Sequence, residues 1–320
     1  MIPLRKLGHS DLEVSPVGLG VLQLGGGSGR LQSLMPAIPE QARIEIIRKA
    51  LEGGINWFDT GEVYGAGRSG RLLAEALAEL GEIDQNAIIA TSWPSFLRFA
   101  GNIKKTNLEQ SNSLNPYSIG LYQVHGSKSL SSVKAEMSTM AGLVEAGKIR
   151  AVGVSNFTAV QMRAAHEALL KRGLGLASIQ VQYNLLDRQI EFNGVLETAR
   201  ELGIGLIASA PLASGILTGK YHQTPDMLDR LPSMRRRGVE KQIETSRPVI
   251  ELLFEIASKY DTEPARVALS WVINQGQDVM AITGASRVGH VLEGIGAMTL
   301  QLSEEDLKRL DQATRNFKEI

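Results

Sequence analysis

Short apolar runs rich in β-branched residues alternate along this chain with longer stretches in which apolar positions recur every three or four residues. The short runs predict buried strands, and the longer stretches predict amphipathic helices. Several helical stretches end at a glycine that is followed within a few residues by the next apolar run, as in repeated βα units. The predicted strands cover residues 17–21, 56–58, 88–91, 119–124, 151–154, 178–183, 205–209 and 279–283.

Helices are predicted between and after these strands. Eight strands that alternate with helices favour an α/β fold, a closed (β/α)8 TIM barrel. A doubly wound sheet is the alternative, but no G-x-G-x-x-G follows the first predicted strand. Residues 4–14 predict an N-terminal β-hairpin that closes the barrel floor, and extra helices are expected at the C-terminus. The predicted helices cover residues 40–52, 71–80, about 99–114, 132–146, 158–171, 194–202, 249–259, 264–274, 289–296 and 304–313.

The chain has 320 residues and no low-complexity linker, which favours one barrel domain over residues 1–320. Residues 221–248 are long, polar and predicted to form a loop. Three consecutive arginines in this loop, Arg235, Arg236 and Arg237, are expected to be solvated. A lid over an anionic ligand is the sharper alternative for them.

Composition narrows the range of functions. The formal net charge is +0, so nothing indicates a nucleic-acid partner or an acidic membrane surface. Cysteine is absent, which excludes disulfides, a thiolate nucleophile and Cys-ligated metal, and no metal site is predicted. No apolar run approaches the ~20 residues of a membrane span, and no signal peptide is expected at the start. A soluble cytoplasmic protein is therefore the expectation, with no indication of its oligomeric state.

Polar residues stand where the predicted strands end. In a parallel barrel these ends meet at one rim, and catalytic residues of such barrels lie there. We therefore expect these side chains to lie close together. Each alone has a simpler explanation, because a Ser or Asn after a strand often caps the next helix and a single His is often structural. The residues are Asp59, Ser92, His125, Ser155, Asn156, Gln180, Gln182 and Ser209.

Two further groups of residues suggest chemistry. Tyr64 follows Asp59 by five positions, and a carboxylate near a phenol suits proton transfer because each group tunes the pKa of the other. Gly284, Ser286 and Arg287 follow the last predicted strand and precede a helical stretch. Backbone N–H groups, a hydroxyl and a guanidinium there predict an anion site, and a capped helix with an exposed arginine is the alternative.

Seven segments, taken in their order and spacing, resemble the aldo-keto reductase family, and the resemblance covers nearly the whole chain. They are GLG at 18–20, FDTGEVYG at 58–65, LYQVHG at 121–126, GKIRAVGVSNF at 147–157, QVQYN at 180–184, PLASGILTGKY at 211–221 and GAS at 284–286. The resemblance implies a (β/α)8 barrel that reduces aldehydes or ketones with NADPH. NADP(H) is the implied cofactor, and NAD(H) stays open.

The resemblance also implies roles for individual residues. Asp59, Tyr64 and His125 match three of the four active-site positions of the family. For the nucleotide, the resemblance implies that Ser155, Asn156 and Gln180 contact the nicotinamide carboxamide and that Ser209 lies beside the ring. It implies that Leu212, Ser214, Gly215 and Lys220 contact the pyrophosphate. The 2′-phosphate and adenine would be contacted by Gly284, Ser286, Arg287 and Glu293.

The fourth active-site position is a lysine in the family, and Ser92 stands there, directly after Ala90 and Thr91. In the family mechanism the ammonium stabilises the tyrosinate that is left after Tyr64 donates its proton. A tuned acid contributes roughly 10²–10⁴-fold in rate, so we expect weak reduction of a small carbonyl or sugar-like substrate. Oxidation of the alcohol should suffer more, because it needs the phenol already deprotonated.

Other interpretations of the same pattern remain open. His125 is an alternative proton donor, because the pKa of histidine lies near neutrality. Lys104 and Lys105 follow Ser92 closely in sequence but are predicted to be solvated on the next helix. Two further hypotheses are an NADP(H)-binding regulatory or sensor protein without turnover, and a non-redox acid/base enzyme on the same scaffold.

Overall fold

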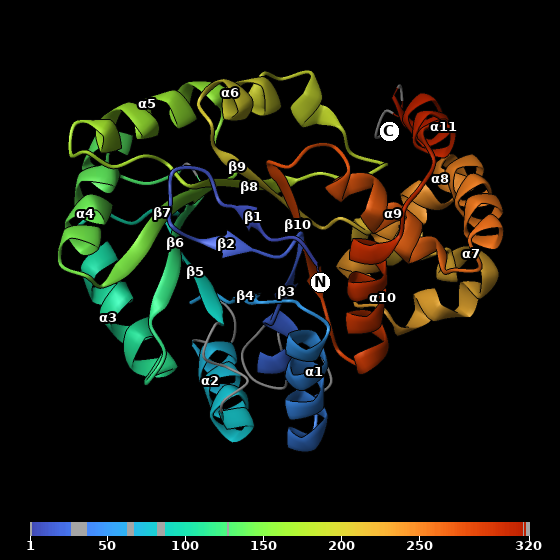
Figure 1. The fold of residues 1–320 in the computed structure, drawn as a ribbon, viewed down its shortest axis with the longest axis horizontal. Helices are drawn as coiled ribbons and strands as arrows, with labels where there is room; N and C mark the ends of the chain where they lie inside the picture. The colour runs from blue at the N-terminus through green and yellow to red at the C-terminus, as the bar shows by residue number, and fades with distance from the viewer. Residues whose placement is uncertain are drawn as a thin grey trace.

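The computed structural model describes residues 2–26, 37–62, 67–81, 87–126, 128–315 and 317. Within these ranges eight parallel strands close into a barrel in the order β10-β3-β4-β5-β6-β7-β8-β9 (Figure 1). The predicted (β/α)8 barrel is therefore confirmed. The strands are β3 (Val17–Gly20), β4 (Trp57–Asp59), β5 (Ile88–Pro94), β6 (Ile119–His125), β7 (Ile149–Ser155), β8 (Ser178–Gln182), β9 (Gly205–Ser209) and β10 (Val279–Gly284).

Helices surround the barrel and connect its strands (Figure 1). They begin where the sequence offers a cap: Ser132 caps α4, and Thr158 forms a capping box with Gln161 at the start of α5. The α-helices are α1 (Glu40–Glu52), α2 (Arg68–Leu80), α3 (Asn102–Leu114), α4 (Val133–Glu145), α5 (Ala159–Leu170), α6 (Val195–Glu201), α7 (Lys220–Gln223), α8 (Ser233–Lys259), α9 (Pro264–Ile273), α10 (Val288–Thr299) and α11 (Glu304–Thr314). Short 3-10 turns are η1 (Leu22–Gly25), η4 (Gln189–Glu191), η5 (Ala213–Thr218) and η6 (Pro225–Arg230).

The predicted N-terminal hairpin is present. Strands β1 (Arg5–Lys6) and β2 (Glu13–Val14) pair antiparallel and cross the middle of the barrel in the view of Figure 1. Leu7, Leu12 and Val14 are buried in one cluster with the inward-facing side chains at the lower ends of the strands. This hairpin plugs the barrel floor, so the opposite end is the open mouth.

Side chains at alternate positions of each strand point into the barrel. At the floor the largest of them is Trp57, whose indole N–H donates to the carbonyl oxygen of Ser15 at 2.9 Å. Its ring lies against Gly18 of β3, where an added Cβ would come within 2.2 Å of the ring. Gly18 is therefore required by the volume of Trp57.

Five strands run one to three residues past their predicted ends, because the apolar and β-branched pattern stops before the strand does. β4 includes Asp59, β6 includes His125, and β5 runs past Ser92 to Pro94. Backbone groups make the ladder, so a polar side chain does not interrupt it. The polar residues of interest therefore lie inside strands, where the alternation of the pleat fixes the direction of each side chain.

The prediction of a loop over residues 221–248 is wrong. This segment holds α7, η6 and the first half of α8, which continues without interruption to Lys259. The polar composition of the segment misled the prediction, and Pro248 lies inside α8 although proline removes a helical hydrogen bond. The carbonyl oxygen of Ile243 accepts hydrogen bonds from His222 and from Ser246, at 3.0 and 3.1 Å. The bond from His222 ties α7 to α8.

The ion pairs of Arg236, the middle residue of the three consecutive arginines, bear on whether this run is solvated or forms a lid. Its guanidinium pairs with Asp229 and with Glu240, each at 2.6 Å. Such pairs on an exposed helix face are typical of a solvated surface. The pairing of Arg236 therefore favours the solvated interpretation over a lid.

Helices α7, α8 and α11 lie outside α9 and α10, on the right in Figure 1. Arg188, which is buried, ties α11 to the barrel. Its guanidinium binds both carboxylate oxygens of Glu191, the Asp311 carboxylate at 2.6 Å and the Thr314 hydroxyl at 3.0 Å. It also lies over the Trp271 ring, 5.1 Å from the centroid. Arg188 is thus one tie to the C-terminal helix, and Asp306 of α11 adds another through Lys259 and Tyr260.

The variant Gly18→Ala should destabilise the fold, because its methyl group has no room beside the buried Trp57 ring. We expect a loss of about 3 kcal/mol or more in the free energy of unfolding, measured by urea denaturation. Gly142→Ala on α4 is the control: nothing lies within 4 Å of its added Cβ, and it should be neutral or stabilising by up to about 1 kcal/mol. Equal effects of the two variants would contradict this packing account.

Arg188→Ala should cost about 3–5 kcal/mol, because it leaves the carboxylates of Glu191 and Asp311 without their shared cation. The measurement is again the free energy of unfolding. Arg247→Ala, which removes an exposed pair with Glu244, is the matched control and should change stability by less than about 1 kcal/mol. A small effect of Arg188→Ala would show that α11 is held mainly by apolar contacts.

Candidate functional site

Six of the sequence-predicted residues lie at the mouth of the barrel and share one property. Each occupies an inward-facing position, in step with the buried interior side chains lower on the same strands. Ladder register places His125, Ser155 and Gln180 side by side on β6, β7 and β8. The six are Asp59, Ser92, His125, Ser155, Gln180 and Ser209.

Asp59, the last residue of β4, is 5% exposed. Burial raises the pKa of its carboxyl group to about 7, and a hydrogen bond from the Gln180 side chain opposes that rise only in part. Among the residues that the structure describes, no cation contributes to this shift. Lys104 and Lys105 are exposed on α3, as predicted. The carboxyl group is therefore close to half protonated at neutral pH.

A chain of hydrogen bonds continues from Gln180 into the barrel. The Gln123 amide nitrogen donates to the Gln180 carbonyl oxygen at 2.6 Å, and the Ser178 hydroxyl donates to the Gln123 carbonyl oxygen at 3.4 Å. Gln123 and Ser178 are buried. Sequence reasoning missed both residues, although they share the inward alternation of His125 and Gln180.

Ser92 lies where β5 approaches the mouth, and it is buried. Gln110 of α3 holds this part of the strand: its amide nitrogen donates to the Ser92 carbonyl oxygen at 2.9 Å, and its oxygen accepts from the Thr91 hydroxyl at 2.8 Å. The strand end is thus fixed from outside the barrel. The Ser92 side chain points inward with a hydroxyl group and no charge.

His125 is half-buried, and burial lowers the pKa of its imidazole. Within the described part of the chain, neither ring nitrogen has a hydrogen-bond partner, which does not favour the structural explanation for this histidine. Ser155 and Asn156 likewise do not cap the next helix, since Thr158 does so. Asn156 has a left-handed backbone with φ of 56°, and its backbone N–H donates to the backbone carbonyl oxygen of Gln180 at 2.9 Å.

Tyr64 lies outside the described residues. Glu62, two positions before it, forms a two-point ion pair with Arg98, with distances of 2.6 and 2.8 Å. Arg98 belongs to the loop that follows β5, so this pair joins two neighbouring loops at the rim. Phe96 and Phe99 of the same loop are 66% and 59% exposed, whereas Trp93 is packed in the core. Phe96 and Phe99 are therefore candidates for an apolar wall near the mouth, and the buried Trp93 is not.

The turn after β9 has the features of an anion site. Ala213, Ser214 and Gly215 are consecutive left-handed residues with φ of 46°, 57° and 94°. The Lys220 ammonium lies over this turn, 3.0 Å from where a Cβ on Gly215 would stand. A concave turn under a cation fits a diphosphate. Leu212 precedes the turn and packs partly buried against the core.

A second cationic cluster lies at the start of α10. The Ser286 nitrogen and the Arg287 Nε lie 3.3 and 3.1 Å from Nδ1 and Nε2 of His290, and a neutral imidazole accepts a hydrogen bond at one of these nitrogens. Burial, then the nearby charges of Arg287 and Lys220, lower the pKa of His290. The helix has no side-chain cap, so the capped-helix alternative fails. Two cations that converge here fit a phosphate group.

Gly284 and Glu293, the other two predicted nucleotide contacts near α10, give weaker support for a nucleotide site. Gly284 ends β10, and an added Cβ there would collide with the Gln23 amide. Glu293 pairs with Arg266 at 3.0 Å, and burial raises the pKa of this glutamate. Its carboxylate is engaged with protein, so a contact with adenine stays a prediction.

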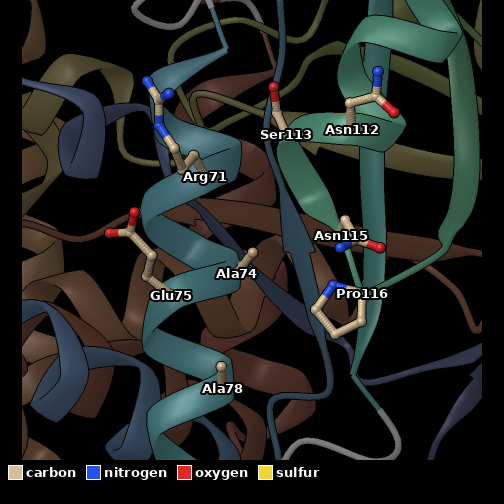
Figure 2. Close-up of a pocket in the computed structure, with 8 residues that line it drawn as sticks. All are labelled: Arg71, Ala74, Glu75, Ala78, Asn112, Ser113, Asn115 and Pro116. Atoms are coloured by element: carbon tan, nitrogen blue, oxygen red, sulfur yellow. The ribbon is translucent and has the colours of Figure 1, made fainter.

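A surface groove of about 470 Å³ lies between α2 and α3, away from the mouth (Figure 2). Arg71 and Glu75 of α2 and Asn112 and Ser113 of α3 are among the residues that line it. None of the sequence-predicted site residues lines it. The inward-facing residues at the mouth are therefore the stronger candidate site. No helix in the described ranges combines the length and apolar character of a membrane span.

Comparisons with known proteins agree with this geometry. The model of the "Aldo/keto reductase family" matches residues 16–315. The chain is 29% identical to a probable aldo-keto reductase 1 from Glycine max, over 96% of this chain and 88% of that protein. It is 32% identical to a chloroplastic pyridoxal reductase from Arabidopsis thaliana, over 98% of this chain and 87% of that protein.

Solved structures show the same fold. A thermostable aldo-keto reductase in complex with the inhibitor epalrestat has a TM-score of 0.75 at 26% identity, over 97% of this chain and 99% of that one. A glycerol dehydrogenase from Gluconobacter oxydans has a TM-score of 0.79 at 27% identity, over 97% and 94%. Since the family match spans nearly the whole barrel, this chain belongs to the aldo/keto reductase family, whose members are oxidoreductases acting on carbonyl compounds.

Proposed function

We propose that this protein is an NADP(H)-dependent reductase of a small aldehyde or ketone. The observation that carries the proposal is the convergence of Asp59, Ser92 and His125 at the barrel mouth, beside Ser155 and Gln180. Ionisable and hydrogen-bonding groups thereby surround one space that is closed below by the hairpin. Family membership supports carbonyl reduction as the chemistry.

The residues on one side of the mouth fit a nicotinamide dinucleotide. We assign its carboxamide to Ser155, Asn156 and Gln180, and the position beside the ring to Ser209. Lys220 and the turn that carries Leu212, Ser214 and Gly215 suit the pyrophosphate. At the start of α10, Ser286 and Arg287 suit a 2′-phosphate, with Gly284 and Glu293 nearby, which favours NADP(H) over NAD(H).

The bound nucleotide supplies a hydride to the carbonyl carbon, and the protein must supply a proton to the carbonyl oxygen. We assign the donation to Tyr64, with His125 oriented toward the same oxygen. Ser92 offers no charge to stabilise the phenolate that remains. The same lack of a cation supports the second candidate, a protein that binds NADP(H) without turnover.

The two relatives suggest the substrates to test. One is named a pyridoxal reductase and the other a glycerol dehydrogenase, so pyridoxal and glyceraldehyde belong in the panel. Both are small polar aldehydes. The exposed Phe96 and Phe99 near the mouth would contact an aromatic ring more favourably than a three-carbon chain.

Ser92→Lys should raise the turnover of such aldehydes with NADPH by roughly 10- to 100-fold, because an ammonium beside Tyr64 lowers the pKa of the phenol. The measurement is the loss of nicotinamide absorbance at saturating NADPH. Tyr64→Phe should abolish turnover, whereas Lys104→Ala and Lys105→Ala should not change it. An unchanged rate in Ser92→Lys would refute this account of the missing cation. NADPH binding without turnover in either form would favour the non-catalytic candidate.

Arg287→Ala tests the nucleotide assignment separately from turnover. A hydrogen bond to a charged group contributes about 1.5–3 kcal/mol, so NADPH affinity should fall about 10- to 100-fold while NADH affinity stays within about twofold. Binding is measured by quenching of protein fluorescence. An equal loss for both nucleotides would place Arg287 away from the 2′-phosphate.

A further inference from the structure

Arg98 joins two loops at the barrel mouth through an ion pair with Glu62. Its two terminal nitrogens donate to the two carboxylate oxygens, at 2.6 and 2.8 Å. A two-point pair of this kind fixes the relative orientation of the two side chains as well as their separation. The side chains of Arg98 and Glu62 are 35% and 25% exposed, so water screens the pair only in part. The loop after β4 is therefore constrained by the loop after β5.

The backbone of Arg98 is itself held by hydrogen bonds. Its N–H donates to the Ser95 carbonyl oxygen at 3.0 Å. Its carbonyl oxygen accepts from the Leu130 N–H at 2.9 Å and from the Ser129 hydroxyl at 3.1 Å. Ser129 and Leu130 belong to the loop after β6. Arg98 is thus anchored on a third loop, independently of its contact with Glu62.

Ser95 continues this anchoring to the strand that carries His125. The Ser95 N–H donates to the backbone carbonyl oxygen of His125 at 3.1 Å, and the Ser95 hydroxyl donates to that of Gly126 at 2.9 Å. The links from His125 to Ser95 and from Ser95 to Arg98 both join backbone groups. They therefore do not depend on flexible side chains, and Arg98 has a fixed place relative to the end of β6.

The backbone of Leu97, directly before Arg98, is strained. It is left-handed, with φ of 54°, and the residue is 61% exposed. Such strain in a leucine persists only where the surrounding structure determines it. The Leu97 N–H donates to the Lys128 carbonyl oxygen at 3.0 Å, again on the loop after β6. The strained turn sets the direction in which the next side chain, Arg98, leaves the loop.

The partner of Arg98, Glu62, lies in the loop that contains Tyr64. The Glu62 carbonyl oxygen accepts from the Gly67 N–H at 3.2 Å, and the buried hydroxyls of Thr60 and Ser69 lie 2.7 Å apart. These two contacts join the start of the loop to its end. Tyr64 lies outside the described residues and follows Glu62 by two positions. The carboxylate of Glu62 is thus a point at which this loop is held by another part of the barrel.

We propose that Arg98 is a positioning residue for carbonyl reduction, which acts through Glu62 to hold the loop of the proton donor Tyr64 in place at the barrel mouth. The effect on turnover rests on the proposed reductase function. A proton donor must come within hydrogen-bond reach of the carbonyl oxygen, and a misplacement of about 1 Å can lower the rate roughly 10²-fold. Ser92 offers no ammonium to hold the phenol from the barrel side, so more of its placement depends on this loop.

The first experiment needs no turnover. Hydrogen–deuterium exchange of a peptide that spans residues 60–69 is compared between the wild type and Arg98→Met by mass spectrometry. Loss of the pair releases the Glu62 side chain, so exchange of this peptide should become about fivefold faster. Exchange at the wild-type rate in Arg98→Met would overturn the inference, because the loop would then be held without Arg98.

Arg163→Met is the matched control. Arg163 forms a two-point pair with Glu201 between α5 and α6, on the side of the barrel away from α2 (Figure 1). Its loss removes the same kind of contact at a distance from the mouth. Exchange of residues 60–69 and turnover should both stay at wild-type values in this variant. A general loosening of the fold would instead speed exchange of the peptide in both variants.

The second experiment separates turnover from nucleotide binding. With saturating NADPH, Arg98→Met should lower kcat for an aldehyde by roughly 10- to 100-fold. NADPH affinity, measured by fluorescence quenching, should stay within about twofold, because the loop after β4 holds none of the assigned nucleotide contacts. Arg98→Lys keeps the charge but not the two-point geometry, so it should restore only part of the loss. An equal fall in kcat and in NADPH affinity would contradict a positioning role, since the whole mouth would then be disturbed.

A double-mutant cycle with Glu62→Gln tests whether the two residues act as one unit. Each single variant should lower kcat to a similar extent, and the double variant should lose no more than the larger single loss. Losses that multiply in the double variant would show that Arg98 acts independently of Glu62, and would refute the proposal.

The outcomes also separate this inference from the proposed function. Faster exchange in Arg98→Met with an unchanged kcat would show that Arg98 holds the loop without positioning the proton donor, which contradicts the inference alone. A wild-type protein without turnover would refute the proposed function, and the exchange experiment would still decide whether Arg98 holds the loop through Glu62.

Discussion

The carboxyl group of Asp59 lies inside a barrel whose other inward-facing strand residues are neutral apart from His125. Burial makes a lone negative charge costly, and a protein can meet that cost with a cation or by keeping the proton. This chain has Ser92 where the resemblance places a lysine, so the proton and the Gln180 amide remain. Gln180, whose side chain is held by Gln123, donates a hydrogen bond that favours the ionised carboxyl and offsets part of that cost.

The barrel makes such an arrangement possible because it separates stability from chemistry along its axis. At the floor, the hairpin and Trp57 fill the interior with apolar side chains, and Gly18 provides the room. At the mouth the same inward alternation presents amide, hydroxyl, imidazole and carboxyl groups. A substitution at the mouth therefore changes the reaction more readily than the fold, and this is how Ser92 is tolerated.

Periodicity and turn residues were sufficient to predict the barrel, its hairpin and most helix bounds, because each βα unit is encoded locally. They failed over residues 221–248, where polar composition suggested a loop and the chain forms α7, η6 and the first half of α8. At the site, the strand-end pattern located Asp59, Ser92, His125, Ser155 and Gln180. It did not reveal Gln123 and Ser178, because their importance arises from contacts across the barrel between strands distant in sequence. The roles of Tyr64 and the nucleotide-binding residues remain predictions.

Closure of the barrel joins the two ends of the polypeptide, since Val17 of β3 pairs with Ala281 of β10. During synthesis β3 lacks its second neighbouring strand, β10, until almost the whole chain has left the ribosome. Contacts of such high sequence separation slow folding, and an unpaired strand edge invites association with other chains. Until β10 is made, the nascent protein is an open sheet, and this topology lengthens the interval in which the free edge of β3 is exposed.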